Sequence, residues 1–138
     1  MSTFKTFEDI EAWQKARSLA HSIHELTIVG SFAKDYKLVN QINGSSGSVM
    51  DNIAEGFERD GTREFIQFLS IAKGSSGETR SQLYRALDRK YISSEQFKEL
   101  FDKSLQISKQ LSNLMSYLKK SEIKGRKFQE PEEDYGED

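Results

Sequence analysis

Hydrophobic residues recur at three- and four-residue steps through most of this chain. In the N-terminal segment, residues 7–29, they occupy Ile10, Trp13, Ala16, Ala20, Ile23 and Leu26. This spacing places apolar side chains along one face of an α-helix. Thr6 precedes the segment, Glu8 and Asp9 suit the positive end of the helix dipole, and Gly30 follows as a stop. The pattern predicts a first helix over residues 7–29.

The longest uninterrupted pattern lies towards the C-terminus. It begins at the capping residues Ser93 and Ser94 and continues through Phe97, Leu100, Ser104, Ile107, Leu111, Leu114 and Leu118. These positions predict a helix that ends near Lys120. Residues 121–138 have no such periodicity and carry three basic and seven acidic side chains. We therefore expect residues 1–120 to form the folded domain and residues 121–138 to form a mobile, charged tail.

Two further helical patterns, residues 36–59 and 62–90, each contain the tetrapeptide Gly-Ser-Ser-Gly. One interpretation is a pair of flexible linkers, because glycine and serine favour loops. The positions favour another, since the midpoint of the two copies falls at Asp60-Gly61, the turn between the segments. In an antiparallel hairpin the two copies would then lie at the same level. We expect both to be helical, with at least one glycine on each helix buried beneath the other.

Four helices joined by short connections predict an all-α fold, an antiparallel up-down-up-down four-helix bundle. The composition agrees with this, since the 138 residues include a single proline, Pro131, and 30% of them are charged. There is no cysteine, which excludes disulfides and thiolate metal sites. No apolar run is long enough to cross a bilayer, so a cytoplasmic protein without a membrane partner is expected.

The densest motif in the chain is Asn52-Ile53-Ala54-Glu55-Gly56-Phe57, followed by Glu64-Phe65-Ile66-Gln67-Phe68-Leu69. The chain resembles the bacterial family of 23S ribosomal RNA intervening-sequence proteins over roughly residues 7–118. The resemblance rests on this motif, on several shorter matches and on Phe7-Glu8-Asp9-Ile10-Glu11-Ala12-Trp13-Gln14. That resemblance implies a four-helix bundle that assembles as a homopentamer. Distant retroelement-accessory relatives imply nucleic acid and a reverse transcriptase as partners. No enzymatic reaction is established for the family.

The chain departs from the family pattern at two places. Asn43-Gly44 stands where the family usually has a basic pair, which reduces the positive charge offered to RNA. Met50 stands where the family usually has proline. Because methionine keeps the backbone donor that proline lacks, the second helix should run straight through this position.

A polar network or interface is expected on the two central helices, at Gln41, Asn52, Glu55, Glu78 and Gln82. Glu55 and Glu78 also suggest an alternative, a carboxylate-based, metal-dependent enzyme. A di-iron bundle would need Glu-x-x-His motifs, which this chain lacks, because its only histidines, His21 and His24, have no glutamate three residues before them. The network is therefore the preferred interpretation, with no metal, cofactor or catalytic residue.

The third helix carries the best candidates for contact with nucleic acid, with Tyr84 and Tyr91 near them. These candidates are Arg63, Lys73, Arg80, Arg85, Arg89 and Lys90. Glu64, Glu78 and Asp88 interleave with them, so an ordinary solvated helix face is the other interpretation.

The aromatic residues raise the question of assembly. Trp13, Phe57, Phe65 and Phe68 offer more surface than one thin bundle covers easily, so we expect part of it to be buried between subunits. The sequence thus predicts a non-enzymatic homopentameric scaffold, with RNA, DNA or a ribonucleoprotein as a candidate partner.

Overall fold

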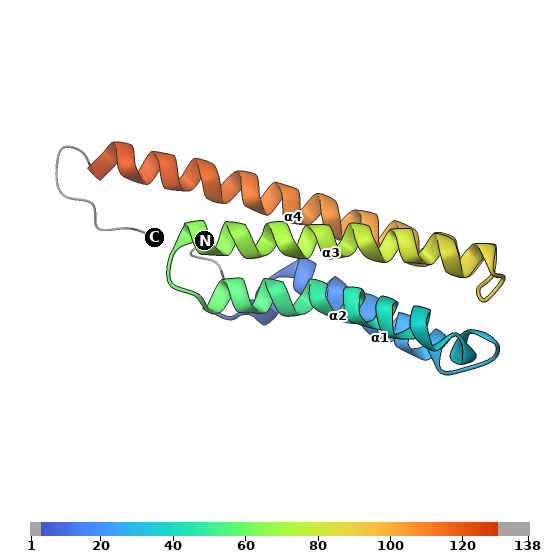
Figure 1. Ribbon diagram of the computed structural model, residues 1–138. Helices are drawn as coiled ribbons and strands as arrows, with labels where there is room; N and C mark the ends of the chain where they lie inside the picture. The colour runs from blue at the N-terminus through green and yellow to red at the C-terminus, as the bar shows by residue number, and fades with distance from the viewer. Residues whose placement is uncertain (1–3, 130–138) are drawn as a thin grey trace.

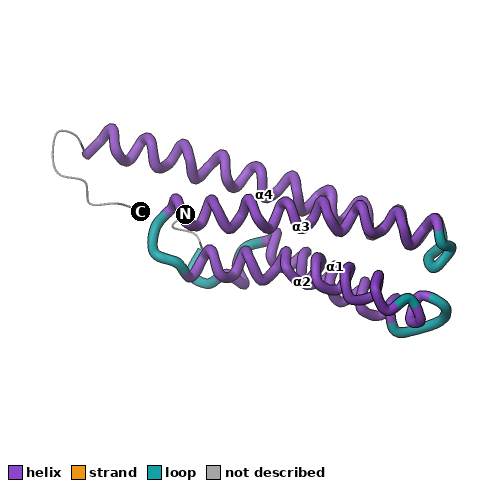
Figure 2. The backbone as a smooth tube through the Cα atoms, viewed as in Figure 1, coloured by secondary structure: helices purple, strands orange, loops and turns teal. Residues whose placement is uncertain are grey.

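The computed structural model describes residues 4–129, with side chains up to residue 123, and all regular structure in this part of the chain is helical (Figures 1 and 2). Two short 3-10 helices, η1 (Phe7–Asp9) and η2 (Phe32–Lys34), accompany four α-helices. These are α1 (Glu11–Thr27), α2 (Tyr36–Glu58), α3 (Thr62–Asp88) and α4 (Ser94–Gln129). The predicted first helix is thus divided, because Ile10 adopts an extended conformation between η1 and α1.

The four α-helices form the predicted four-helix bundle (Figure 1). Each helix contacts its two neighbours, and the contact between α1 and α4 closes the ring. Every helix contributes fully buried apolar side chains to one core, among them Leu19, Ile42, Leu69 and Ile107. Over the described residues, no helix is long and apolar enough to cross a membrane.

Both Gly-Ser-Ser-Gly segments are helical, as predicted, and α2 continues unbroken through Met50. The prediction that their glycines pack beneath the opposite helix is wrong. A Cβ added at Gly44, Gly47 or Gly74 would meet nothing within 4 Å, and one at Gly77 would meet only the Arg80 side chain at 3.6 Å. The serines face the neighbouring helices instead.

Serine and threonine hydroxyls make the close contact between α2 and α3. Ser45 Oγ lies 2.9 Å from Thr79 Oγ1 and donates to Gln82 Oε1, while Ser75 Oγ donates to Ser48 Oγ at 3.0 Å. Small side chains let the helices approach, and paired hydroxyls remove the cost of burying polar atoms. The two segments therefore lie at the same level of the hairpin, as expected, but serines rather than glycines make the contact between the helices.

Glycine is required by packing at a different position, Gly56 in the Asn-Ile-Ala-Glu-Gly-Phe motif. A Cβ built there would lie 2.5 Å from Phe68 Cβ and 3.1 Å from Phe65 Cδ1. Gly56 lies close to the turn, where Gly61 takes a φ of 109°. The motif thus marks a point at which α2 and α3 approach closely beside the turn.

The last helix extends beyond its predicted end near Lys120, because α4 continues to Gln129. Residues 121–129, assigned above to a tail, are therefore helical, while residues 130–138 lie outside the described residues. Glu122 in this extension pairs with Arg63 at the start of α3, with 3.3 Å between Oε2 and Nε.

The aromatic residues are largely covered by the chain itself. Trp13 and Phe65 are buried, and Phe57 and Phe68 are half-buried. Arg59 covers Phe68, with 5.0 Å between the guanidinium carbon and the ring centroid. Phe7 packs edge-on against Trp13 with 5.1 Å between ring centroids, and Phe57 against Phe65 with 5.8 Å. The chain itself thus covers much of this aromatic surface, and the expected burial of the remainder between subunits stays a prediction.

Gly56→Ala should lower the free energy of unfolding by about 1–3 kcal/mol, because the new methyl group overpacks the contact with Phe68. The control is Gly77→Ala, where the methyl group meets only a flexible side chain and alanine favours helix by up to about 1 kcal/mol. Urea unfolding followed by circular dichroism measures both. Equal effects of the two substitutions would contradict this account of the motif.

Candidate nucleic-acid interface

A layer of buried hydroxyl groups joins α3 to α4. Ser76 Oγ donates to the Ser104 carbonyl at 3.0 Å and lies 2.7 Å from Ser104 Oγ, and both residues are 0% exposed. Ser108 Oγ donates to Ser76 Oγ at 3.1 Å. These serines stand on the apolar stripes of their helices, where their small volume allows close packing and each hydroxyl finds a partner.

Arg80 lies over this layer, one turn along α3 from Ser76. Its Nη1 donates to Ser108 Oγ at 2.8 Å and Ser104 Oγ at 3.1 Å, with Ser76 Oγ at 3.4 Å. Among the described residues no carboxylate forms an ion pair with it, and neither Nη2 nor Nε has a hydrogen-bond acceptor. Arg80 is thus a half-buried residue whose guanidinium is held by neutral groups, with no carboxylate to neutralise its charge.

Arg80 opens onto a groove of about 390 Å³ between α3 and α4. The groove is lined by three cationic, three neutral polar and one apolar side chain: Lys73, Arg80, Lys109, Ser108, Ser112, Asn113 and Leu105. Acidic residues are missing from the lining because residues 65–77 and 103–121 contain none. Antiparallel packing places these two segments side by side (Figure 1). A local positive field therefore exists on a chain with a net charge of −2.

An aromatic cluster continues this surface along the same two helices. Tyr84 lies one turn beyond Arg80, and its ring centroid is 4.9 Å from that of Phe97 and 5.7 Å from that of Phe101. The Arg80 guanidinium carbon lies 6.0 Å from the Phe101 ring centroid, which joins the cluster to the cationic groove. Tyr84 is 50% exposed, so an accessible aromatic residue lies next to the Arg80 end of the groove.

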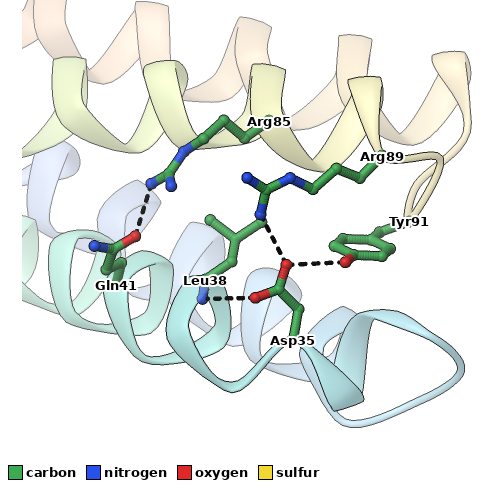
Figure 3. Close-up of polar contacts among 6 residues, drawn as sticks. All are labelled: Asp35, Leu38, Gln41, Arg85, Arg89 and Tyr91. Atoms are coloured by element: carbon green, nitrogen blue, oxygen red, sulfur yellow. Dashed lines mark hydrogen bonds and ion pairs between the residues drawn. The ribbon is translucent and has the colours of Figure 1, made fainter.

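Arg89 contributes to a second polar cluster (Figure 3). It directly follows the last residue of α3, so the cluster lies at the end of this helix away from the α2–α3 turn. Asp35 caps α2 by accepting the Leu38 N–H at 3.2 Å, and its other oxygen accepts Arg89 Nη1 at 2.8 Å and the Tyr91 hydroxyl at 2.9 Å. The Tyr91 hydroxyl, the Leu38 N–H and Arg89 hold the pKa of Asp35 below its ordinary value. This cluster ties the start of α2 to the end of α3, so its arginine serves the fold.

The other predicted cations also divide between structural and exposed positions. Arg85 Nη2 donates to Gln41 Oε1 at 2.7 Å (Figure 3), and Arg63 pairs with Glu122. Lys90 follows α3 with a φ of 62°, in the left-handed conformation that commonly ends a helix. Only Lys73 and Arg80, of the six predicted cations, lie together in the groove. Lys109 and Asn113 on α4 were missed, and the absence of acidic residues from 103–121 was the signal that could have found them.

The predicted polar network is divided into separate contacts. Gln41 binds Arg85, Asn52 Nδ2 donates to the Ser48 carbonyl at 2.8 Å, and Glu55 pairs with Arg59 at 3.0 Å. Gln82 Nε2 donates to Glu78 Oε2 at 3.2 Å, while its carbonyl accepts from Ser45. These contacts stabilise the α2–α3 hairpin at several levels.

The structure does not bring Glu55 and Glu78 together. Gly56, next to Glu55, lies against Phe68, and positions 68 and 78 are separated by about 15 Å at about 1.5 Å per residue. His21 Nε2 lies 3.4 Å from Glu25 Oε2 on the surface of α1. Over the described residues, no three histidine or acidic side chains are grouped so that they could hold a metal ion.

The fold and the groove define a small antiparallel helical bundle that carries a cationic and aromatic surface along one pair of helices. The chain belongs to the family of 23S rRNA-intervening sequence proteins, whose model matches residues 8–113, and this confirms the resemblance. It is similar to a solved structure of a protein of unknown function from the S23 ribosomal protein family of Bacteroides thetaiotaomicron. That similarity has a TM-score of 0.69 and 25% sequence identity, and covers 75% of this chain and 97% of the other. No curated protein matches the chain.

Asp35→Asn tests the second cluster, because asparagine can still cap α2 but carries no charge for Arg89. Since the pKa of Asp35 is lowered in the folded state, its charge stabilises the fold fully above the unfolded-state pKa of about 3.9. That contribution is lost as the pH falls through the lower, folded-state pKa. The variant should therefore be less stable than the wild type at pH 6, and the difference should shrink towards pH 3 in urea unfolding. A difference independent of pH would contradict the charged contact.

Proposed function

We propose that this protein is a non-enzymatic, homo-oligomeric scaffold that associates with nucleic acid. The observation that carries the proposal is the α3–α4 groove, which Lys73, Arg80 and Lys109 line without a carboxylate beside them. Cations that have no carboxylate beside them are free to neutralise phosphates. The fold alone would not support this function, because four-helix bundles serve many roles.

The alternative, a metal-dependent enzyme centred on Glu55 and Glu78, receives less support from the geometry. A paired-carboxylate site needs both groups near one reacting centre or one metal ion. The two glutamates lie at different levels of the hairpin, and each has its own neighbour, Arg59 and Gln82. A structural role for both glutamates accounts for these contacts.

The proposed assembly is a homopentamer. Its first support is the family resemblance, and its second is the position of Gly44, Gly47 and Gly74. Each of these glycines costs the helix about 1 kcal/mol relative to alanine. Within the chain, no close contact explains this cost, because a Cβ built at any of the three positions would meet nothing within 4 Å. Close approach of another subunit would offset that cost.

Association with nucleic acid should depend strongly on salt. If three groove cations each contact a phosphate, log Kobs for an unstructured RNA should fall with log salt concentration with a slope of about −2. Fluorescence anisotropy with an end-labelled oligouridylate measures the slope. An RNA that fails to bind at low ionic strength, together with protein purified free of nucleic acid, would refute the association.

Light scattering should give a mass five times that of the chain at micromolar concentration. Gly44→Leu should reduce this mass, because the leucine is free of contacts in the single chain but would obstruct a close neighbour. Gln106→Leu, at an exposed position on α4, is the matched control and should leave the mass unchanged. A wild-type monomer would refute the assembly, and a pentameric Gly44→Leu variant would remove Gly44 from its interface.

A further inference from the structure

We propose that the α3–α4 groove holds a single strand of nucleic acid, with a phosphate at Arg80, Lys73 and Lys109 and a neighbouring base stacked on Tyr84. The inference rests on the proposed association with nucleic acid, and adds the site and the form of the nucleic acid. Two independent features of the surface carry it: the unneutralised cations of the groove and the exposed aromatic ring at its end.

Arg80 is prepared for an anion by its contacts. Ser104 and Ser108 hold Nη1, so the guanidinium plane is fixed before a ligand arrives. Nη2 and Nε have no acceptor among the described residues, and these donors suit the oxygens of a phosphate. Ordering the side chain in advance reduces the entropy lost on binding.

The groove beside Arg80 has room and charge for a phosphate. Gly77 lies three residues before Arg80 on α3 and has no side chain, and a Cβ there would lie 3.6 Å from Arg80 Nη2. Lys73 and Lys109 add positive charge from the two helices, and Asn113 offers an amide for further hydrogen bonds. The lining thus combines one fixed fork of donors with two flexible cations.

Tyr84 supplies the second half of the site. It follows Arg80 by one helical turn, about 5–6 Å along α3, so a phosphate and a base of one strand can reach both groups. Phe97 and Phe101 support the Tyr84 ring from α4 and leave half of the residue exposed. A positively charged groove with an aromatic platform is the arrangement that binds single strands without reading their sequence.

The geometry favours a single strand over a duplex. Bases in a duplex are stacked on one another, so Tyr84 would have no free base to contact. An acidic peptide could neutralise the cations, but it would gain nothing from an aromatic ring placed for stacking.

The test is fluorescence anisotropy of a labelled oligouridylate with the full chain, in competition with an unlabelled duplex and with polyglutamate. Lys73→Glu with Lys109→Glu should weaken binding at least about tenfold and reduce the salt slope by about 1.4, the value for two lost phosphate contacts. Lys34→Glu with Lys37→Glu makes the same change in charge near the α1–α2 connection and should alter binding little.

Tyr84→Leu should weaken binding of the single strand about tenfold, whereas Tyr84→Phe should preserve it, because stacking needs the ring and not the hydroxyl. Tyr36→Leu is the control, at a residue that is 74% exposed on another helix. Circular dichroism confirms that each variant is folded.

The outcomes separate this inference from the proposed function. Wild-type protein that binds neither form of nucleic acid refutes both. Binding that survives the Lys73 and Lys109 substitutions, or that Tyr84→Leu leaves unchanged, refutes the site and leaves the association intact. A duplex or polyglutamate that competes as well as the single strand also refutes the inference.

Discussion

The hydrogen-bonded contact between Ser76 and Ser104 determines how α3 and α4 meet. Both side chains are fully buried, and their hydroxyls lie 2.7 Å apart in a core that is otherwise largely apolar. Larger side chains would separate the helices, and unpaired polar ones would carry a desolvation cost. Because the contact is small and polar, the helices stay close and Ser108 and Arg80 can join it from the groove side. The core contact and the candidate site are therefore parts of one structure.

Burial of one face of each helix explains which parts of the fold could be predicted from the sequence. Spacing of apolar residues was sufficient for the four helices and their order, since a bundle buries one stripe of each helix. Composition could not predict which residues of the Gly-Ser-Ser-Gly segments face the adjacent helix, because glycine and serine are both small and either could pack there. Ser45 and Ser76 lie on the continuing apolar stripes, and that register places the glycines outside.

The candidate site was predicted in part, because side-chain partners depend on tertiary structure. Arginines at 63, 85 and 89 resemble Arg80 in sequence, yet each has an acceptor supplied by a distant helix segment. Arg80 differs from Arg63 and Arg89 because its acceptors are neutral serines, and from Arg85 because it lies in the groove with two lysines. Lys109 became relevant only once α4 was known to pack beside α3. The end of α4 was underestimated for a related reason, since loss of amphipathic spacing after Lys120 does not itself stop a helix.

The central claim is that an uncompensated positive charge at Arg80 forms a binding site on a chain whose net charge is negative. Nuclear magnetic resonance tests it most directly, by following the Arg80 Nε–H signal and backbone amides during titration with an oligouridylate. The account predicts that the Arg80 signal and the amides of the α3–α4 groove shift together and saturate. Shifts confined to the Asp35 end of the bundle, or an Arg80 signal that does not move while the strand binds, would contradict it.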